Sequence, residues 1–323
     1  MISEGQKYKN IFVWNHSACE NAIIQKCRKS NNIKNIFFAN KNSISMTKGI
    51  IPVKSIKEEF FKELKENNVN IILANAGINN TGFLELCVSK GFECIGADRR
   101  SCISEKSKIF SKNLMKKYGI TTAPYIVLEH PDEINKEIKN IKFPTVIKAN
   151  GYAKSLSAVI VNNPKELFDI SQKYLGGYFN DASKRIIIED CVMDKNGTEV
   201  SVPLICDGKT LKVINFVRDY KRHLDGDLGS NTGSMGSYCP YILSKEQKNL
   251  IFELVEKLQT ALSCENLLYK GFMTINVIIN DNKAYLLEIN TRLGDSEGQV
   301  VLELIENDIC ELFEAILSEN IFF

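Results

Sequence analysis

The sequence predicts an α/β protein, with a parallel sheet in the N-terminal third and mixed sheets and helices after it. Its 323 residues are 44% hydrophobic and 25% charged, a balance typical of folded chains with two or three compact units. Residues 10–100 alternate short apolar runs with amphipathic stretches, the pattern of strands joined by crossover helices. Near the C-terminus a long apolar stripe precedes two β-type runs, which indicates a helix followed by a hairpin.

The elements of the N-terminal third follow from this alternation. The apolar runs predict strands at residues 11–14, 36–38 and 71–73, and the amphipathic stretches predict helices at 22–29 and 58–66. Open α/β sheets bind ligands in the crevice at the carboxyl ends of their strands. We therefore expect a binding crevice at the strand ends of this sheet.

A helix at residues 104–118 is expected at a domain junction. Its apolar residues Phe110, Leu114 and Tyr118 recur every four positions, and Gly119 ends it. After this helix, three β-rich runs and one amphipathic stretch predict a small α+β unit. The expected strands lie at residues 145–148, 159–161 and 186–188, and the expected helix at 164–174.

The C-terminal region is expected to hold a long helix and a β-hairpin. Ser244 and Gln247 form a capping box at the start of the helix. The hairpin strands are expected at residues 272–279 and 284–289, on either side of four turn residues. These elements divide the chain into an N-terminal domain (1–103), a linker segment (104–142), the small α+β unit (143–206) and a C-terminal subdomain (207–323).

Composition narrows the range of partners. Forty-one Lys and Arg face 39 Asp and Glu, so the net charge of +2 gives no general attraction to nucleic acid or to an anionic membrane. The ten cysteines form no C-x-x-C pair and only three histidines accompany them, which argues against a zinc site. The N-terminus lacks the plan of a signal peptide, so we expect a cytoplasmic protein with reduced thiols.

The segment 285–292 carries the strongest chemical pattern. Alternation along a strand places Glu288, Asn290 and Arg292 on one face. A carboxylate and an amide oxygen in this arrangement suit Mg2+, and the arginine suits a phosphate or carboxylate. The alternative is an ordinary half-exposed strand with a salt bridge.

Two further segments are candidates for ligand binding. Four glycines lie within residues 226–236, next to the cations of residues 218–222, which favours a substrate-binding loop over a merely flexible one. Glu189 to Val192 ends an apolar run and precedes Glu199, so its backbone and that carboxylate could bind adenine and ribose. Lys108 and Lys148 are candidates for phosphate contacts, although a single lysine is more often a solvated surface group.

Taken together, these motifs resemble those of the glycinamide ribonucleotide synthetases (phosphoribosylamine–glycine ligases) of the ATP-grasp superfamily. The resemblance covers roughly residues 10–318 and is densest in three segments: 105–108, 219–238 and 287–299. It implies an ATP-grasp fold with an N-terminal Rossmann-like domain, in which residues 143–206 form the lid. It also implies a monomer or homodimer that acts on small molecules.

The resemblance further implies an ATP-dependent carboxylate–amine ligase that forms an amide through an acyl phosphate. The implied ATP-binding residues are Lys108, Lys148, Lys154, Ser157, Glu189, Val192 and Glu199. The implied Mg2+ ligands, with Mn2+ as an alternative ion, are Glu288 and Asn290, and Asn276 is the candidate for a further ligand. The implied substrate-binding residues are Asp219, Asn231, Thr232, Gly233, Arg292 and Asp295, with Lys221 and Arg292 as catalytic groups.

The sequence departs from the family's pattern in three places. The glycine-rich loop after the first strand is replaced by residues 14–22, and a Gly-Pro-Glu segment by residues 75–80. The lid loop at residues 151–158 has lost two glycines. These changes, together with the end of the sequence at Phe323, predict a shortened, divergent paralogue that activates an amino-acid carboxylate for an amine other than phosphoribosylamine. The alternatives are a divergent phosphoribosylamine–glycine ligase and a regulatory protein that binds ATP without turnover.

Overall fold

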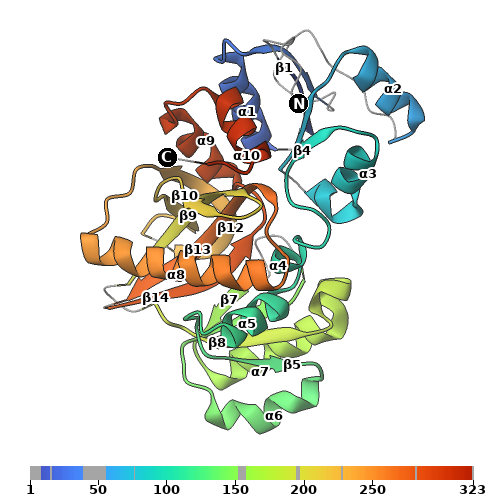
Figure 1. Ribbon diagram of the computed structural model, residues 1–323. Helices are drawn as coiled ribbons and strands as arrows, with labels where there is room; N and C mark the ends of the chain where they lie inside the picture. Colours follow the sequence, from blue (N-terminus) through green and yellow to red (C-terminus); the bar gives the residue numbers. More distant parts are fainter. Residues whose placement is uncertain are drawn as a thin grey trace.

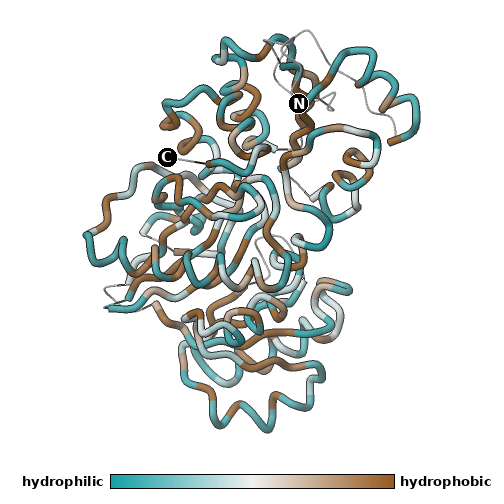
Figure 2. Tube along the Cα trace, viewed as in Figure 1, coloured by the Kyte–Doolittle hydropathy of each residue, from teal (hydrophilic) through white to brown (hydrophobic). Residues whose placement is uncertain are grey.

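A computed structural model describes residues 9–14, 17–38, 56–75, 77–151, 158–193, 197–226, 228–280 and 282–321 (Figure 1). Within these residues the strands form three four-stranded sheets and one two-stranded ribbon. Hydrophobic strand segments lie between helices that carry hydrophilic stretches (Figure 2). The predicted α/β class is confirmed. Lys154 and Ser157 lie outside the described residues.

The N-terminal sheet is parallel, in the order β2-β1-β3-β4. Its strands are β1 (Lys9–Trp14), β2 (Ile33–Phe38), β3 (Ile71–Ala74) and β4 (Glu93–Ile95), and its helices are α1 (Ala18–Arg28), α2 (Glu58–Glu66) and α3 (Phe83–Ser89). Ile11 and Val13 of β1 pack in the cluster that contains α1, while Phe12 packs in the cluster that contains α2 and α3. The three strands and two helices predicted here are confirmed, although α1 begins four residues earlier than expected.

The C-terminal helices α9 (Asp295–Leu304) and α10 (Ile309–Leu317) share a core with this N-terminal sheet. Val301 and Phe313 belong to the same buried cluster as Ile11 and as Ile205 of the central sheet. Figure 1 shows these red helices beside the blue helix α1. Helices α9 and α10 therefore join the N-terminal sheet to the central sheet. They cross the boundary expected between the N-terminal domain (1–103) and the C-terminal subdomain (207–323).

The helix predicted at residues 104–118 is broken into α4 (Ile103–Lys106) and α5 (Lys108–Lys117). Ser107 has an extended backbone and caps α5, because its Oγ accepts the N–H of Phe110 at 3.2 Å. Oδ1 of Asn150 accepts the N–H of Ile109 at 2.9 Å, so a second cap reaches α5 from the lid. The apolar period does not reveal this break, because the residues that carry it lie after Ser107. Leu114 and Met115 of α5 are buried whether or not the helix is broken at that point.

The sheet that contains the segment expected to form the lid, called the lid sheet below, is antiparallel, in the order β5-β8-β6-β7. Its strands are β5 (Tyr125–Leu128), β6 (Thr145–Ala149), β7 (Ala158–Val161) and β8 (Ile186–Asp190), and its helices are α6 (Ile134–Glu137) and α7 (Pro164–Lys173). Short turns of helix in this region lie at Pro131–Glu133, Ile138–Asn140, Tyr174–Tyr178 and Asn180–Ser183, and another, Gly77–Thr81, follows β3 in the N-terminal sheet. The sheet thus includes β5, which precedes the expected start of the unit at residue 143, and the expected end at residue 206 falls inside the next strand, β9.

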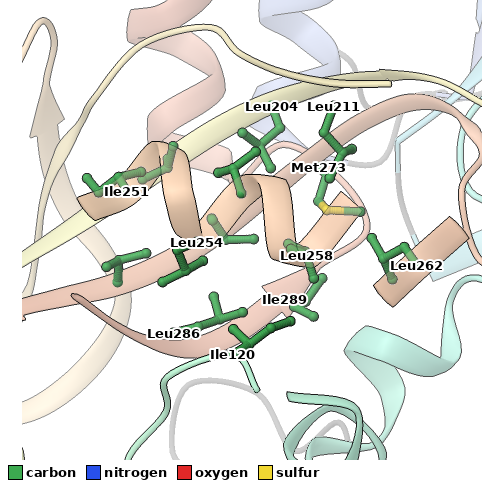
Figure 3. Packing of buried hydrophobic residues seen from close by; sticks show 14 of the residues in the cluster. Ile120, Leu204, Leu211, Ile251, Leu254, Leu258, Leu262, Met273, Leu286 and Ile289 are labelled. Atoms are coloured by element: carbon green, nitrogen blue, oxygen red, sulfur yellow. The ribbon is translucent and has the colours of Figure 1, made fainter. Parts of the chain in front are cut away.

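The central sheet is antiparallel, in the order β10-β9-β13-β14, and one face is covered by the long helix α8. The bounds are β9 (Thr198–Asp207), β10 (Leu211–Val213), β13 (Lys270–Asn280), β14 (Lys283–Asn290) and α8 (Lys245–Cys264). Ile251, Leu254 and Leu258 of α8 pack on Leu286 and Ile289 of the sheet (Figure 3). The predicted hairpin and capping box are confirmed.

A two-stranded ribbon, β11 (Arg218–Leu224) and β12 (Leu228–Tyr238), carries the glycine-rich segment beside the central sheet. Ser201 of β9 forms an isolated bridge with Val217 just before the ribbon. No helix in the described part of the chain is long and apolar enough to cross a membrane.

Candidate active site

The central sheet has one apolar face, against α8, and one polar face. Ile275 and Val277 of β13 belong to the core that contains α8, so Thr274 and Asn276 lie on the opposite face. Asn276 is directly opposite Glu288, and Thr274 is opposite Asn290. Cross-strand partners share a face. We call this set the polar face: Glu199, Ser201, Thr274, Asn276, Glu288 and Asn290.

A β-bulge gives Glu288 its orientation. Val277 pairs with Leu286 and Asn276 pairs with Glu288, so Leu287 is one extra residue in β14. Strict alternation would place Glu288 with Leu286, toward α8. Because the bulge shifts the alternation by one residue, Leu286 and Ile289 both pack toward α8, and Glu288 turns to the polar face.

Three lysines from different elements converge on Glu288. Burial opposes its ionisation, but Lys221, Lys148 and Lys108 outweigh burial and hold its pKa below the usual range. These lysines come from β11, β6 and the first turn of α5. Lys221 also pairs with Glu199 at 2.5 Å. The site therefore gathers lysines around Glu288 and its neighbouring carboxylates, a suitable environment for polyphosphate.

A buried charge triad lies beside this group. Glu189, 2% exposed, pairs with Lys112 at 2.6 Å and also with Lys148. Burial opposes the ionisation of Glu189, but Lys148 and Lys112 outweigh burial and lower its pKa. Nζ of Lys112 donates to Oγ1 of Thr122 at 2.7 Å, and Thr122 donates to the carbonyl of Leu286 at 2.6 Å. This chain of contacts joins the lid sheet to the bulged strand.

Lys112 was not among the predicted site residues, although its spacing from Lys108 signals it. Lys112 follows Lys108 by four residues, so the two lie on the same side of α5. Burial lowers the pKa of both lysines. Glu189 has contacts that the sequence does not reveal, since its carboxylate pairs with two lysines and its backbone pairs with β5 and β6.

The oxygen donors of the polar face fit a small hard cation. Oδ1 of Asn276 and Oγ1 of Thr274 are buried and have no hydrogen-bond partner, and each lies opposite one predicted metal ligand. Buried polar atoms normally have a partner, and these two oxygens are available to one. Among the described residues, no three His, Cys, Asp or Glu side chains form a group suited to a metal. An ion here would depend on one carboxylate, neutral oxygens and the phosphates of a nucleotide.

The predicted substrate residues lie where the ribbon meets the start of α9. Oδ1 of Asp219 accepts Ser234 Oγ at 2.5 Å and Ser296 Oγ at 3.4 Å, and burial raises the pKa of Asp219. Thr232 Oγ1 donates to the carbonyl of Lys221 at 2.8 Å. Asp295 begins α9, and its Oδ1 accepts the N–H of Cys19 at 3.3 Å.

Arg292 follows the end of β14 and is oriented by Glu105. Its Nε donates to Oε1 of Glu105 at 3.0 Å, and Oε2 of Glu105 accepts the N–H of Thr291 at 2.9 Å. Glu105 is a second functional residue that the sequence analysis did not single out, although it begins one of the motifs that carry the resemblance. It fixes the direction of the guanidinium.

Three predicted residues have looser connections to this centre. The carbonyl of Val192 accepts Nδ2 of Asn280 at 3.0 Å, at the Glu199 end of the polar face. Asn231 pairs with Arg222 inside the ribbon. In the described part of the chain, no side-chain hydrogen bond or ion pair joins Asn231 or Gly233 to the other candidates.

Comparison with known proteins supports a specific family. The family model for the phosphoribosylglycinamide synthetase ATP-grasp (A) domain matches residues 106–298. The phosphoribosylamine–glycine ligase of Thermotoga maritima is 36% identical over 200 residues, which are 62% of this chain and 50% of that protein. The enzyme of that name from Clostridium acetobutylicum is 30% identical over 306 residues, 94% of this chain and 66% of that protein.

The fold agrees with the sequence match. The crystal structure of the Thermotoga maritima phosphoribosylamine–glycine ligase superposes with a TM-score of 0.83 at 28% identity, covering 97% of this chain and 76% of that one. This chain spans between half and 66% of the length of the two curated relatives named above. By domain match, identity and fold, the chain belongs to the phosphoribosylglycinamide synthetase family and has the ATP-grasp fold.

Proposed function

We propose that the chain is an ATP-dependent carboxylate–amine ligase, which forms an amide through an acyl phosphate and releases ADP and phosphate. The observation that carries the proposal is the convergence of Lys108, Lys148 and Lys221 on the ionised Glu288. These side chains come from α5, the lid sheet, the ribbon and the central sheet. Such a set of charges suits the transfer of a phosphoryl group, which needs positioning and neutralisation rather than a nucleophilic side chain.

Each of these residues would have a separate role in binding ATP, the metal ion or the carboxylate. Lys108 and Lys148 neutralise the phosphates of ATP, and Lys221 stabilises the charge that develops on the transferring group. Glu288, Asn290 and Asn276 would hold Mg2+, or Mn2+, which supplies further charge neutralisation when bound. Arg292, held by Glu105, orients the carboxylate that is phosphorylated and later attacked by the amine.

On the nucleotide side, Glu199 would accept the ribose hydroxyls and the backbone around Val192 would bind the adenine edge. Glu189 contributes indirectly, because it holds Lys148 in place. Lys154 and Ser157 remain proposed phosphate contacts of the lid.

On the substrate side, an α-amino acid is the proposed carboxylate donor. Asp219 and Asp295 would accept from its ammonium group, within a pocket completed by Asn231, Thr232 and Gly233. We propose a cytoplasmic monomer or homodimer acting on small molecules. A second candidate is phosphoribosylamine–glycine ligation, which the names of the relatives favour. An ATP-binding regulatory protein without turnover is the third.

The deciding experiment measures ADP and phosphate release from ATP and Mg2+ in the presence of single amino acids, each with and without a panel of amines. Mass spectrometry identifies the product. Release that depends on one amino acid, with an amide product, establishes a ligase. Nucleotide binding without release under any combination would contradict the proposal and favour the regulatory role.

Asp219→Asn separates the amino-acid pocket from the nucleotide site. We expect the KM for the amino acid to rise about tenfold or more, because an ionic hydrogen bond to its ammonium group is weakened. The Kd for ATP should change less than twofold. Ser234→Ala, which removes the hydroxyl that donates to Asp219, is the control for a purely structural effect. Equal losses in both constants would make Asp219 a structural residue.

A further inference from the structure

A groove that shares no residue with the candidate active site lies where α3, α4, α5 and the turn after α8 meet. Figure 1 shows α4 beside the C-terminal end of α8. The groove is open to solvent and has a volume of about 610 Å3. This volume is in the range of pockets that hold small molecules.

The floor of the groove is apolar. It is formed by Ile103 of α4, Phe110 of α5 and Leu267 after α8. Leu267 belongs to the buried core beneath α8, and the half-buried Ile103 and Phe110 pack against that core. A ligand with a flat apolar group would remove water from this floor and could lie on the ring of Phe110.

The rim of the groove is charged, and its cations outnumber its carboxylates. Arg99 and Arg100 line the groove together with Glu85 and Glu265. Glu265 is already paired with Lys117 at 2.6 Å. Oε1 of Glu85 accepts the backbone N–H of Arg99 at 2.6 Å. Three cations therefore stand against two carboxylates, a balance that favours an anionic ligand.

The two arginines have donors to spare. In the described part of the chain, no hydrogen bond or ion pair involves the guanidinium of Arg99. Arg100 donates from Nη2 to the carbonyl of Glu265 at 2.9 Å, which uses one of its five N–H donors. A guanidinium presents its donors in a planar fork that matches the oxygens of a phosphate or a carboxylate. The rim thus offers an oxyanion site beside an apolar floor.

The groove and the candidate active site share two helices. On α4, Ile103 lines the groove, while Glu105 holds Arg292 at 3.0 Å. On α5, Phe110 lines the groove, while Lys108 belongs to the candidate active site. Residues two apart on a helix point to nearly opposite sides. A ligand in the groove would therefore contact the two helices that position Arg292 and Lys108.

We propose that this groove is a regulatory site for a small anion, whose phosphate or carboxylate binds Arg99 and Arg100 while its flat ring lies on Phe110. A nucleoside monophosphate and an aromatic acid both have this chemistry. Such a ligand restrains α4 and α5, and so changes the affinity of the candidate active site for ATP. The proposal goes beyond the ligase function, because it concerns a second site and its effect on nucleotide binding.

The first arm of the test is calorimetric titration, with and without a saturating non-hydrolysable ATP analogue and Mg2+. Phenyl phosphate carries both the ring and the anion and should bind saturably in both conditions. Inorganic phosphate lacks the ring and should bind about tenfold more weakly or less. AMP and benzoate distinguish a nucleotide from an aromatic acid. If phenyl phosphate, AMP and benzoate all fail to bind in the presence of the analogue, the proposal is wrong.

Variants assign the binding to the groove. Arg99→Ala should weaken the binding of phenyl phosphate about tenfold or more, because charged hydrogen bonds are lost. Phe110→Leu keeps an apolar floor but removes the ring, and should narrow the difference between phenyl phosphate and inorganic phosphate. Arg28→Ala, at an exposed position on α1, is the matched control and should bind like the wild-type protein. Undiminished binding by Arg99→Ala would overturn the proposal.

The second arm measures the Kd for the ATP analogue with and without saturating phenyl phosphate. We expect this Kd to change about fivefold or more, and the analogue should change the Kd for phenyl phosphate by the same factor. Arg99→Ala should abolish the change while keeping the Kd for the analogue alone. An unchanged Kd in both directions would overturn the regulatory role. Neither arm depends on ADP release, so a failure of the ligase function is distinguishable from a failure of this proposal.

Discussion

At the scale of single residues, Glu288 depends on charges that are distant in the sequence. Its strand supplies the carboxylate, but its ionisation is set by lysines from α5, β6 and β11, which offset the cost of burial. Asn276, on the neighbouring strand, contributes an oxygen without a partner. The site is thus formed by tertiary contacts. A substitution that removes one charge should therefore change ligand binding more than it changes folding stability.

Glu288→Gln tests this directly. We expect turnover to fall by about 10² to 10³-fold, because the metal loses its charged ligand and the phosphoryl group loses alignment. The thermal unfolding curve should stay close to that of the wild-type protein, since the amide keeps the size of the side chain. Glu256→Gln, at an exposed position on α8, is the control and should retain full activity. Undiminished turnover at saturating Mg2+ would refute the assignment.

Within the triad of Lys112, Glu189 and Lys148, removal of the carboxylate should destabilise the protein more than removal of one lysine. Glu189→Gln removes the carboxylate that pairs directly with two buried lysines and should lower the free energy of unfolding by about 3–5 kcal/mol. Lys112→Met leaves the Glu189–Lys148 pair intact and should cost about 1 kcal/mol. Urea unfolding of both variants measures the difference. Equal losses would show that the triad is not an electrostatic unit.

The same triad sets the direction of a pH effect. The pKa of Glu189 is depressed in the folded protein, so its stabilisation is present above the unfolded value of about 4.3 and is lost as the pH falls through the folded value. Wild-type stability should therefore fall more steeply than that of Glu189→Gln as the pH drops below about 5. Parallel curves would contradict this assignment.

At the scale of elements, the sequence predicts what depends on local periodicity. Strand β1 follows from an apolar run, α2 from an amphipathic stretch, and α8 from its capping box and leucine stripe. The break at Ser107 and the extra residue Leu287 were not predictable, because each is defined by a partner elsewhere. The break at Ser107 depends on Asn150, which caps α5 from the lid sheet. The extra residue Leu287 is defined by the register between β13 and β14.

The close approach of α1 and α9 gives a prediction at this scale. A Cβ on Gly298 would lie 2.3 Å from Sγ of Cys19, so Gly298→Ala should destabilise the protein by about 1–3 kcal/mol. Cys19→Ala removes the obstructing sulfur. The double variant should therefore be less destabilised than the sum of the single variants, as measured by urea unfolding. Strict additivity would show that the two helices adjust without strain.

At the scale of the whole molecule, the cores define two cooperative units. One buried cluster joins β1 and α1 to α9, α10 and the central sheet. The lid has its own cluster, built from residues such as Leu128, Ile147 and Leu167. The contacts described between the lid and the rest of the site are mainly polar, through Asn150 and the charge triad. Apolar packing therefore ties the N-terminal and central sheets together more firmly than it ties the lid to either.

Hydrogen exchange should resolve these two units. Without nucleotide, amides of β6 and β8 should exchange through openings of lower free energy than those of β1 and β13, which should share one value. The residues proposed to bind ATP and Mg2+ lie on both units, since Lys148 lies in the lid and Glu288 in the central sheet. At about 100 times the Kd, nucleotide should add about 2.7 kcal/mol to the opening of the lid. The Glu288→Gln variant should show less protection at the same nucleotide concentration, because its metal site is impaired. Equal exchange of β6 and β13 without nucleotide would mean that the lid is not a separate unit, and that the polar contacts around Lys112 couple it to the rest as firmly as a shared core would.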